Sequence, residues 1–206
     1  MALDPVRLPE TCKYLASLPE GIRSFPKCLV KDVAVDAYVH DFSALASEPG
    51  LPEPVAELLR GGVRATWLPE TVFQVTHVVV RELAFPNDKE FFEWVFRANA
   101  ELFDKPLLRS LMRLLSPGLI VIGAGKRWTT FHQGSELVPG RVSRSGDREE
   151  TTARLRYPSG LFTRAFLAGL EHAFLAALVA SRAKGPRVEL GAVSDGEAEY
   201  RVSWHP

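Results

Sequence analysis

Histidine and acidic side chains are the residues of this sequence that could transfer protons or hold a metal ion. His132, His172 and His205 are candidate bases or ligands, and Asp41 or Glu171 could pair with an imidazole. Glu171 and His172 are adjacent, so on a helix they would point about 100° apart. No spacing puts two metal ligands on one face, and no hydrolase or zinc-protease signature is present. We therefore predict no metal site, and acid–base catalysis and structural hydrogen bonding both stay open.

A glycine-rich segment, Gly123-Ala-Gly-Lys126, is similar in composition to a phosphate-binding loop. A P-loop needs a glycine five residues before its Gly-Lys pair and a Ser or Thr after it. Ile120 and Arg127 occupy those positions, so the match fails. We expect these glycines to let a helix pack closely on its neighbour.

Basic residues recur every four positions at Lys105, Arg109 and Arg113, within a leucine-rich segment. This pattern is typical of an amphipathic helix that lies on a membrane or a partner. It is equally typical of a solvated helix whose leucines fill the core. Lys126 and Arg127 extend the basic set and favour an anionic ligand or partner.

Aromatic residues are concentrated between positions 67 and 131. Such a set can fill a core, or it can line an apolar pocket between helices and a sheet. If the pocket exists, we predict that these residues form its rim: Trp128, Phe131, His132, Tyr157, Arg164 and His172.

The composition argues against several classes of protein. The 25 basic residues are balanced by 25 acidic ones, whereas a nucleic-acid-binding protein normally has a basic excess. No apolar run has the roughly 18 residues of a transmembrane helix, and the first residues lack a secretory signal pattern. Cys12 and Cys28 have no histidine close by and match neither a zinc spacing nor a disulfide framework. We therefore expect a cytoplasmic protein with reduced thiols.

The element that must position these residues is the stretch from Ser135 to Trp204, which we interpret as hairpin, long helix, hairpin. The helix, 162–182, is apolar nearly all round, and its charged residues Arg164, Glu171 and Arg182 lie on one stripe. A helix of this kind is covered on two sides. We expect a sheet beneath it and further helices above it.

Period-two patterns predict four strands around that helix. The strands are a weak one at 137–143, then 151–157, 188–192 and one ending with Tyr200, Val202 and Trp204. Opposite charges on neighbouring strands are typical of a solvated antiparallel face. The predicted fold class is therefore α+β, a helical block followed by a four-stranded antiparallel sheet.

The first half of the chain predicts mostly helices. A leader of residues 1–29 should carry a helix at 9–18 and pack on one α+β domain, 30–206, made of a helical block (42–132) and a sheet-and-helix unit (135–204). The alternation at 30–39 favours a strand, with a helix as the competing interpretation. Proline and glycine positions predict the helices 42–45, 52–60, 69–85, 87–102, 107–115 and 117–132.

Several short motifs give the chain a family resemblance. They are Trp67-Leu-Pro-Glu70, Arg127-Trp128, Phe131-His132-Gln-Gly134, Tyr157-Pro158 and Tyr200-Arg-Val-Ser-Trp204. In this order they resemble uncharacterised myxobacterial proteins of about this length that occur as many paralogues per genome. The resemblance covers roughly residues 30–204. Its layout is in turn similar to haem-nitric-oxide-binding and 4-vinyl-reductase-type domains, which bind small molecules or serve as sensory and assembly modules.

The haem-binding relatives provide a specific test. They hold the porphyrin carboxylates with a Tyr-x-Ser-x-Arg motif and the iron with a histidine on a helix. Tyr157-Pro158-Ser159 matches the first half of that motif, but Leu161 stands where arginine is expected, and Arg164 is the nearest substitute. The resemblance makes His77 the candidate axial ligand, and a packing histidine is the alternative. We expect no cofactor and keep haem as an alternative.

These observations favour a non-enzymatic sensory or regulatory module. It would bind a small hydrophobic or anionic molecule, or a protein partner such as a second copy of itself. The alternative is an enzyme acting on a molecule of the same kind, with His132 or His172 as general base. A haem or gas sensor is the third hypothesis.

Overall fold

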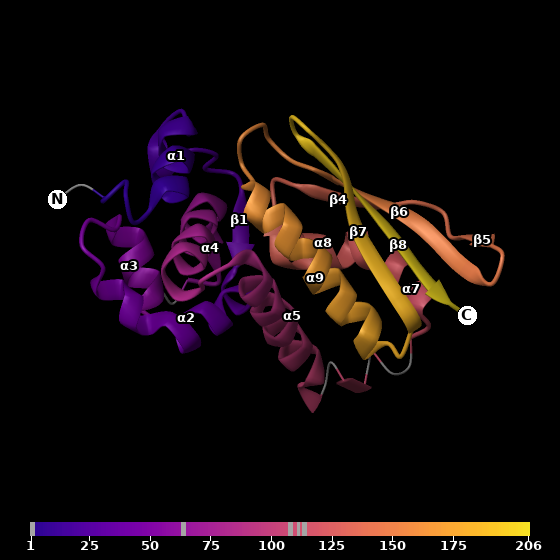
Figure 1. The fold of residues 1–206 in the computed structure, drawn as a ribbon. Coiled ribbons are helices and arrows are strands. Elements are labelled where there is room, and N and C mark those ends of the chain that lie inside the picture. Colours follow the sequence, from indigo (N-terminus) through magenta and orange to yellow (C-terminus); the bar gives the residue numbers. More distant parts are fainter. Residues whose placement is uncertain (1–2, 63–64, 107–108, 111, 113–114) are drawn as a thin grey trace. The chain divides into compact units, whose positions relative to one another are not determined.

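The computed structural model describes residues 3–62, 65–106, 109–110, 112 and 115–206 (Figure 1). The chain forms two compact units. Unit 1 comprises Met1–Phe91, Thr130–Gly134 and Pro158–Phe166, and unit 2 comprises Phe92–Thr129, Ser135–Tyr157 and Leu167–Pro206. The predicted division into a leader (1–29) and one domain (30–206) stays a prediction.

Helix α4, Glu70–Ala84, is the centre of unit 1. Pro69 precedes it, and every residue from Glu70 to Val80 is buried. Its interior contains many β-branched valines, which are only moderate helix formers, so packing rather than propensity stabilises it. The helices around it are α1 (Pro9–Ser17), α2 (Asp36–Phe42) and α3 (Glu53–Leu59), with short 3-10 helices at Gly21–Arg23, Asp32–Ala34 and Ser43–Ser47.

The helix predicted at 9–18 is confirmed, and Glu82 of α4 holds its first turn. The Glu82 carboxylate accepts hydrogen bonds from the backbone N–H groups of Glu10 (2.6 Å) and Thr11 (3.1 Å), and from the Thr11 hydroxyl (2.6 Å). Glu82 therefore supplies, from another helix, the cap that Leu8 at the N-cap position cannot provide.

Unit 1 also contains a small antiparallel sheet that we did not predict. Its strands are β1 (Leu29–Lys31), β2 (Trp67–Pro69) and β3 (His132–Gln133), in the order β2-β1-β3. The strand predicted at 30–39 is wrong beyond Lys31, because a 3-10 turn and α2 follow. The competing helix interpretation applies from Asp36 onward.

Unit 2 contains the larger antiparallel sheet. The strands β4 (Glu136–Pro139), β6 (Arg148–Arg156), β8 (Glu197–His205) and β7 (Lys184–Ser194) lie in that order, and β5 (Ser143–Ser145) pairs with β6. The strand predicted at 137–143 is thus two strands, β4 and β5, and the sheet has five. The fold class, α+β with an antiparallel sheet, is confirmed.

Helix α9, Arg164–Ala180, packs on this sheet through its unit 2 residues (Figure 1). The Tyr200 hydroxyl donates to the backbone oxygen of Leu167 (2.8 Å), and the Phe174 ring meets the Tyr200 ring edge to face. Along α9, all of whose residues are described, only Arg164 and Val179 are exposed. The predicted long helix packed on an antiparallel sheet is confirmed, and its cover by further helices stays a prediction.

The remaining helices are α5 (Asp88–Asp104), α7 (Pro117–Ile122) and α8 (Ala124–Phe131). The helix predicted at 117–132 is broken at Gly123 into α7 and α8. A Cβ at Gly125 would lie 2.6 Å from the backbone oxygen of Leu137, so this glycine permits the close packing that we predicted. The helix predicted at 107–115 lies largely outside the described residues.

Candidate functional site

Buried polar side chains are concentrated in unit 1. Of the ten polar or charged residues that are buried in the described part of the chain, eight belong to unit 1 and two, Thr151 and Ser181, to unit 2. Burying a polar group costs free energy unless it is hydrogen-bonded, so such groups indicate a structural network or a site. Two sets of these groups occur on α4.

The first set joins Glu70 to His132. Residue 30 pairs with both Leu68 of β2 and His132 of β3, so the small sheet brings His132 close to the start of α4. Nδ1 of His132 donates to Oε2 of Glu70 at 3.0 Å, and the side chains are 9% and 1% exposed. A carboxylate that accepts from Nδ1 orients the imidazole, as in many catalytic dyads.

The same network continues from Glu70 toward α9. The Gln74 amide donates to Oε1 of Glu70 (3.1 Å), and the Gln74 oxygen accepts from the backbone N–H (3.3 Å) and hydroxyl (3.4 Å) of Thr163. The Thr163 hydroxyl in turn accepts from the Phe166 N–H. Because each described link has a partner, these contacts stabilise unit 1 as well as orienting His132.

Cys28, which precedes β1, does not add a nucleophile to this network. Burial raises the pKa of its thiol, and Glu70 raises it further. A buried thiol with a raised pKa is a poor nucleophile. Cys12 and Cys28 are both free cysteines.

The second set is His77 and Tyr38. The Tyr38 hydroxyl lies 2.6 Å from Nδ1 of His77, and both residues are buried. Nε2 of His77 is buried and has no hydrogen-bond partner among the described residues. Such an atom is rare in native proteins and requires an explanation, which can be strain, a water molecule or a ligand.

Aromatic rings of unit 1 surround this imidazole. The ring centroids of Phe91, Phe166, Tyr38 and Phe73 lie 4.8, 5.6, 5.8 and 6.3 Å from that of His77. Three of these contacts are edge to face and the Tyr38 contact is tilted. His77 therefore lies in an aromatic shell made by α2, α4 and the first residues of α5 and α9.

Burial keeps the His77 ring uncharged. It lowers the pKa of His77 from 6.5 to about 3, and the Arg81 charge lowers it slightly further. The backbone of Ala165 acts in the opposite direction but does not reach Nε2 with hydrogen-bond geometry. At neutral pH the site therefore offers one neutral imidazole nitrogen inside an apolar shell.

The six predicted rim residues are divided between the units. Phe131, His132 and Arg164 belong to unit 1, and Trp128, Tyr157 and His172 belong to unit 2. The prediction that all six line one pocket therefore stays a prediction.

The unit 2 members have structural contacts of their own. Trp128 donates from Nε1 to the Ser135 hydroxyl at 3.0 Å. His172 stacks on Phe92, with ring centroids 5.1 Å apart. Burial lowers the pKa of His172, although neighbouring Glu171 raises it. Burial and then Asp195 raise the pKa of the Tyr157 hydroxyl.

Glu171 also has a structural partner, which sequence reasoning did not identify. Its carboxylate accepts from the backbone N–H of Leu190 at 2.9 Å. The β7–β8 register shifts between Leu190 and Val193, so the N–H is at a bulge. In this structure Glu171 satisfies a backbone donor of the sheet.

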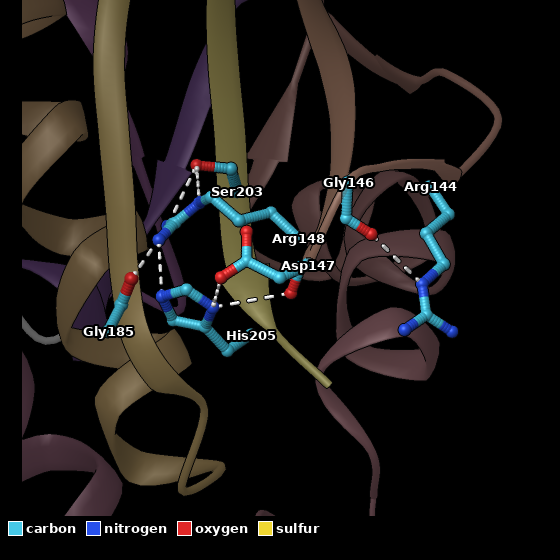
Figure 2. Close-up of polar contacts among 7 residues, drawn as sticks. All are labelled: Arg144, Gly146, Asp147, Arg148, Gly185, Ser203 and His205. Atoms are coloured by element: carbon cyan, nitrogen blue, oxygen red, sulfur yellow. Dashed lines mark hydrogen bonds and ion pairs between the residues drawn. The ribbon is translucent and has the colours of Figure 1, made fainter.

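His205 lies in a polar cluster at the end of the large sheet (Figure 2). Arg148 donates to Nε2 of His205 (2.8 Å), to the Gly185 backbone oxygen (2.7 Å) and to the Ser203 hydroxyl (3.0 Å). Because a guanidinium has no acceptor, Nε2 must accept, and Nδ1 carries the proton toward Asp147. Both nitrogens of His205 are thus engaged, and the cluster ties β6, β7 and β8 together.

Sequence reasoning missed Glu70, Gln74 and Tyr38. A signal was present for the first two, because Glu70, Gln74 and His77 are spaced by four and three residues on one face of an apolar helix. For Tyr38 the expected strand at 30–39 concealed its place on a helix. No group of three or more His, Cys, Asp or Glu side chains within the described ranges could hold a metal ion.

Comparisons with known proteins show a shared fold and no family. No protein-family model and no curated protein matches the chain. One solved structure matches with a TM-score of 0.52 and 12% identity. It comes from work on modulating haem redox potential through protein-induced porphyrin distortion. The match covers 85% of this chain and 99% of that one. In the described ranges, no helix has the length and apolar character to cross a membrane. This chain therefore has the fold of that structure, and the myxobacterial resemblance stays a prediction.

Proposed function

We propose that this protein is a non-enzymatic small-molecule-binding module whose site is the aromatic shell around His77. The observation that carries the proposal is the buried Nε2 of His77, which has no hydrogen-bond partner among the described residues. A ligand that hydrogen-bonds to this atom would satisfy it, and the surrounding rings would contact the apolar remainder of that ligand.

Stability alone does not account for a histidine at this position. An unsatisfied buried polar group costs about 1–3 kcal/mol, and the contact with the Tyr38 hydroxyl accounts for Nδ1 of His77 but not for Nε2. Proteins retain such local costs chiefly at functional sites. The unsatisfied Nε2 therefore supports a binding role for His77 in addition to its structural contact with Tyr38.

The shared fold with a structure from a study of haem supports small-molecule binding in general. The residues as packed do not fit a porphyrin, however. Rings lie 4.8–6.3 Å from the imidazole centroid, and His77 is only 2% exposed, so a porphyrin on Nε2 would require several rings to move apart. Leu161, at the position of the expected arginine, is fully buried and apolar. We expect a ligand much smaller than haem.

A melting-temperature screen tests the proposal. We expect small neutral compounds from a fragment library to raise the melting temperature of the wild-type protein. The His77→Phe variant should not respond, because the variant lacks the nitrogen while it keeps an aromatic ring. If the same fragments raise the melting temperatures of both proteins equally, His77 is not part of the binding site and the proposed site is rejected. A flat response with both would leave the protein-interaction hypothesis.

Haem addition provides a separate test of the cofactor. We expect no Soret band shift that depends on His77, because the packed rings leave no room for axial ligation. A band present in the wild type and absent in His77→Phe would contradict this expectation and establish the haem hypothesis.

The Glu70–His132 pair favours one second candidate, an enzyme with His132 as general base. The 3.0 Å contact supplies the oriented imidazole that such chemistry needs. The test is hydrolysis of p-nitrophenyl acetate by the wild type and by His132→Gln. If the two rates are equal, His132 has no base function toward this substrate class and the pair is structural.

A further inference from the structure

We infer that His77 binds its ligand as a hydrogen-bond donor through Nε2–H, and that the ligand is a small uncharged molecule with an acceptor oxygen or nitrogen. This inference rests on the proposed function and deepens it by defining the ligand class. The inference depends on the contact between Nδ1 of His77 and the Tyr38 hydroxyl, and on the burial of the surrounding rings.

The contact with Tyr38 determines where the imidazole proton lies. The Tyr38 oxygen and Nδ1 of His77 are 2.6 Å apart, so one of the two groups donates to the other. A phenol is a stronger acid than a neutral imidazole N–H, and the unprotonated ring nitrogen is the stronger acceptor. We therefore assign the Tyr38 hydroxyl as donor and Nδ1 as acceptor, which leaves the proton on Nε2.

This tautomer also determines what Nε2 can bind. With a proton on Nε2, the nitrogen has no lone pair for a metal. The same contact therefore disfavours iron ligation and favours a ligand that accepts a hydrogen bond.

The shell also restricts the charge and size of the ligand. All four rings around His77 are buried, and Arg81 is the charged residue whose field lowers the pKa of His77. Transfer of an ion into such surroundings is costly, so anions and ammonium ions should be excluded. Because rings pack closely on the imidazole, a ligand must displace at least one of them and should contain only a few heavy atoms. A ketone, ether or nitrile of benzene size or smaller meets these conditions.

A matched pair of probes tests the inference. Cyclohexanone and methylenecyclohexane have nearly the same shape, but only the ketone has an acceptor. We expect the ketone to bind wild-type protein about tenfold more tightly, the factor that one buried hydrogen bond provides. The preference should disappear in His77→Phe and persist in His77→Gln, whose amide keeps a donor. Cyclohexanecarboxylate should not bind.

Nitrogen-15 NMR of the histidine rings reads the tautomer directly. Without probe, the His77 spectrum should show Nε2 protonated and Nδ1 unprotonated, and cyclohexanone should shift the Nε2 signal. A proton on Nδ1 would overturn the inference. Equal affinity for ketone and hydrocarbon, lost in His77→Phe, would overturn it while the proposed function stands. If neither probe gives a response that depends on His77, Nε2 contacts only water. Both this inference and the proposed function would then fail.

Discussion

The two units bury different kinds of side chain. The interior of unit 1 includes a carboxylate, an amide and two imidazoles on or beside α4, whereas the core of the unit 2 sheet is formed by Ala153, Leu155, Tyr200, Val202 and Trp204. In unit 2 the charged pairs are placed on the solvated face, as in Arg154–Glu199 (3.3 Å). Unit 2 is thus organised as a scaffold, and unit 1 has the side chains that chemistry or binding would use.

The hydrogen bonds of two histidines, one in each unit, also differ. Both nitrogens of His205 in unit 2 have partners, whereas His77 in unit 1 has a partner for Nδ1 alone among the described residues. A histidine with both nitrogens satisfied is explained by structure. One with a buried unsatisfied nitrogen is a candidate for binding.

The largest expected effect is on stability, and it compares a buried pair of unit 1 with an exposed pair of unit 2. Glu70→Leu should lower the free energy of unfolding by about 2–4 kcal/mol, because the buried Nδ1–H of His132 and the Gln74 amide both lose this acceptor. Glu199→Ala, which breaks an exposed pair of unit 2, should cost less than about 1 kcal/mol. Urea unfolding followed by fluorescence measures both. The double variant Glu70→Leu, His132→Phe should recover much of the loss. A cost for Glu70→Leu as small as that of Glu199→Ala would remove the contrast.

Acid should destabilise the protein through His77. Its folded pKa, about 3, lies below the usual 6.5, so the unfolded chain takes up a proton first as pH falls. The stabilisation is complete above pH 6.5 and is lost between pH 6.5 and 3, by up to about 1.4 kcal/mol per pH unit. His77→Phe lacks this contribution. From pH 7 to pH 5 the difference in unfolding free energy should therefore shift steadily in favour of His77→Phe, and parallel profiles would contradict the burial of His77.

A glycine substitution tests the tight packing of unit 2. Gly125→Ala places a Cβ 2.6 Å from the Leu137 backbone oxygen and should cost about 1–3 kcal/mol despite the better helix propensity of alanine. Gly118→Ala is the matched control, because its nearest neighbour, the Trp204 ring, is 3.9 Å away. Thermal melting compares them. Equal melting temperatures would show that α8 and β4 can separate without loss.

The smallest expected effect concerns the polar cluster of Figure 2. Arg148→Lys should cost about 1 kcal/mol, because an ammonium cannot contact Ser203, His205 and Gly185 at the same time. Hydrogen exchange should become faster at the end of β7 and β8 where Lys184 pairs with His205. Arg144→Lys, whose guanidinium contacts the Gly146 oxygen at 3.4 Å, is the control and should leave exchange there unchanged.

The sequence was sufficient to predict helix α9 and the strands β6, β7 and β8 of the large sheet. Buried and more exposed residues alternate regularly in β6 and β8. This period of two is enough to predict that Tyr200, Val202 and Trp204 face the core. Proline positions predicted α4 and α5, and Asn87 caps α5 by accepting from the Glu90 N–H (3.0 Å). These features are local, and local patterns determine them.

The candidate site could be predicted only in part. The family resemblance singled out His77 as a candidate haem ligand, but Tyr38 was assigned to a strand because short alternating and helical patterns overlap at 30–39. Glu70 and His132 are 62 residues apart and meet through strands of two or three residues, which are too short to show a period. Long-range pairing of this kind has no local signal.

The contact between Glu171 and Leu190 has a consequence for how the protein behaves at high concentration. β7 is the outermost strand of its sheet, and one of its amide protons is already occupied by a carboxylate. Pro186 offers no amide proton at all, and irregular register on both sides of 187–190 bends the ribbon. A strand from another molecule could therefore not form a continuous ladder of hydrogen bonds with β7, which opposes the strand pairing from which fibrils grow.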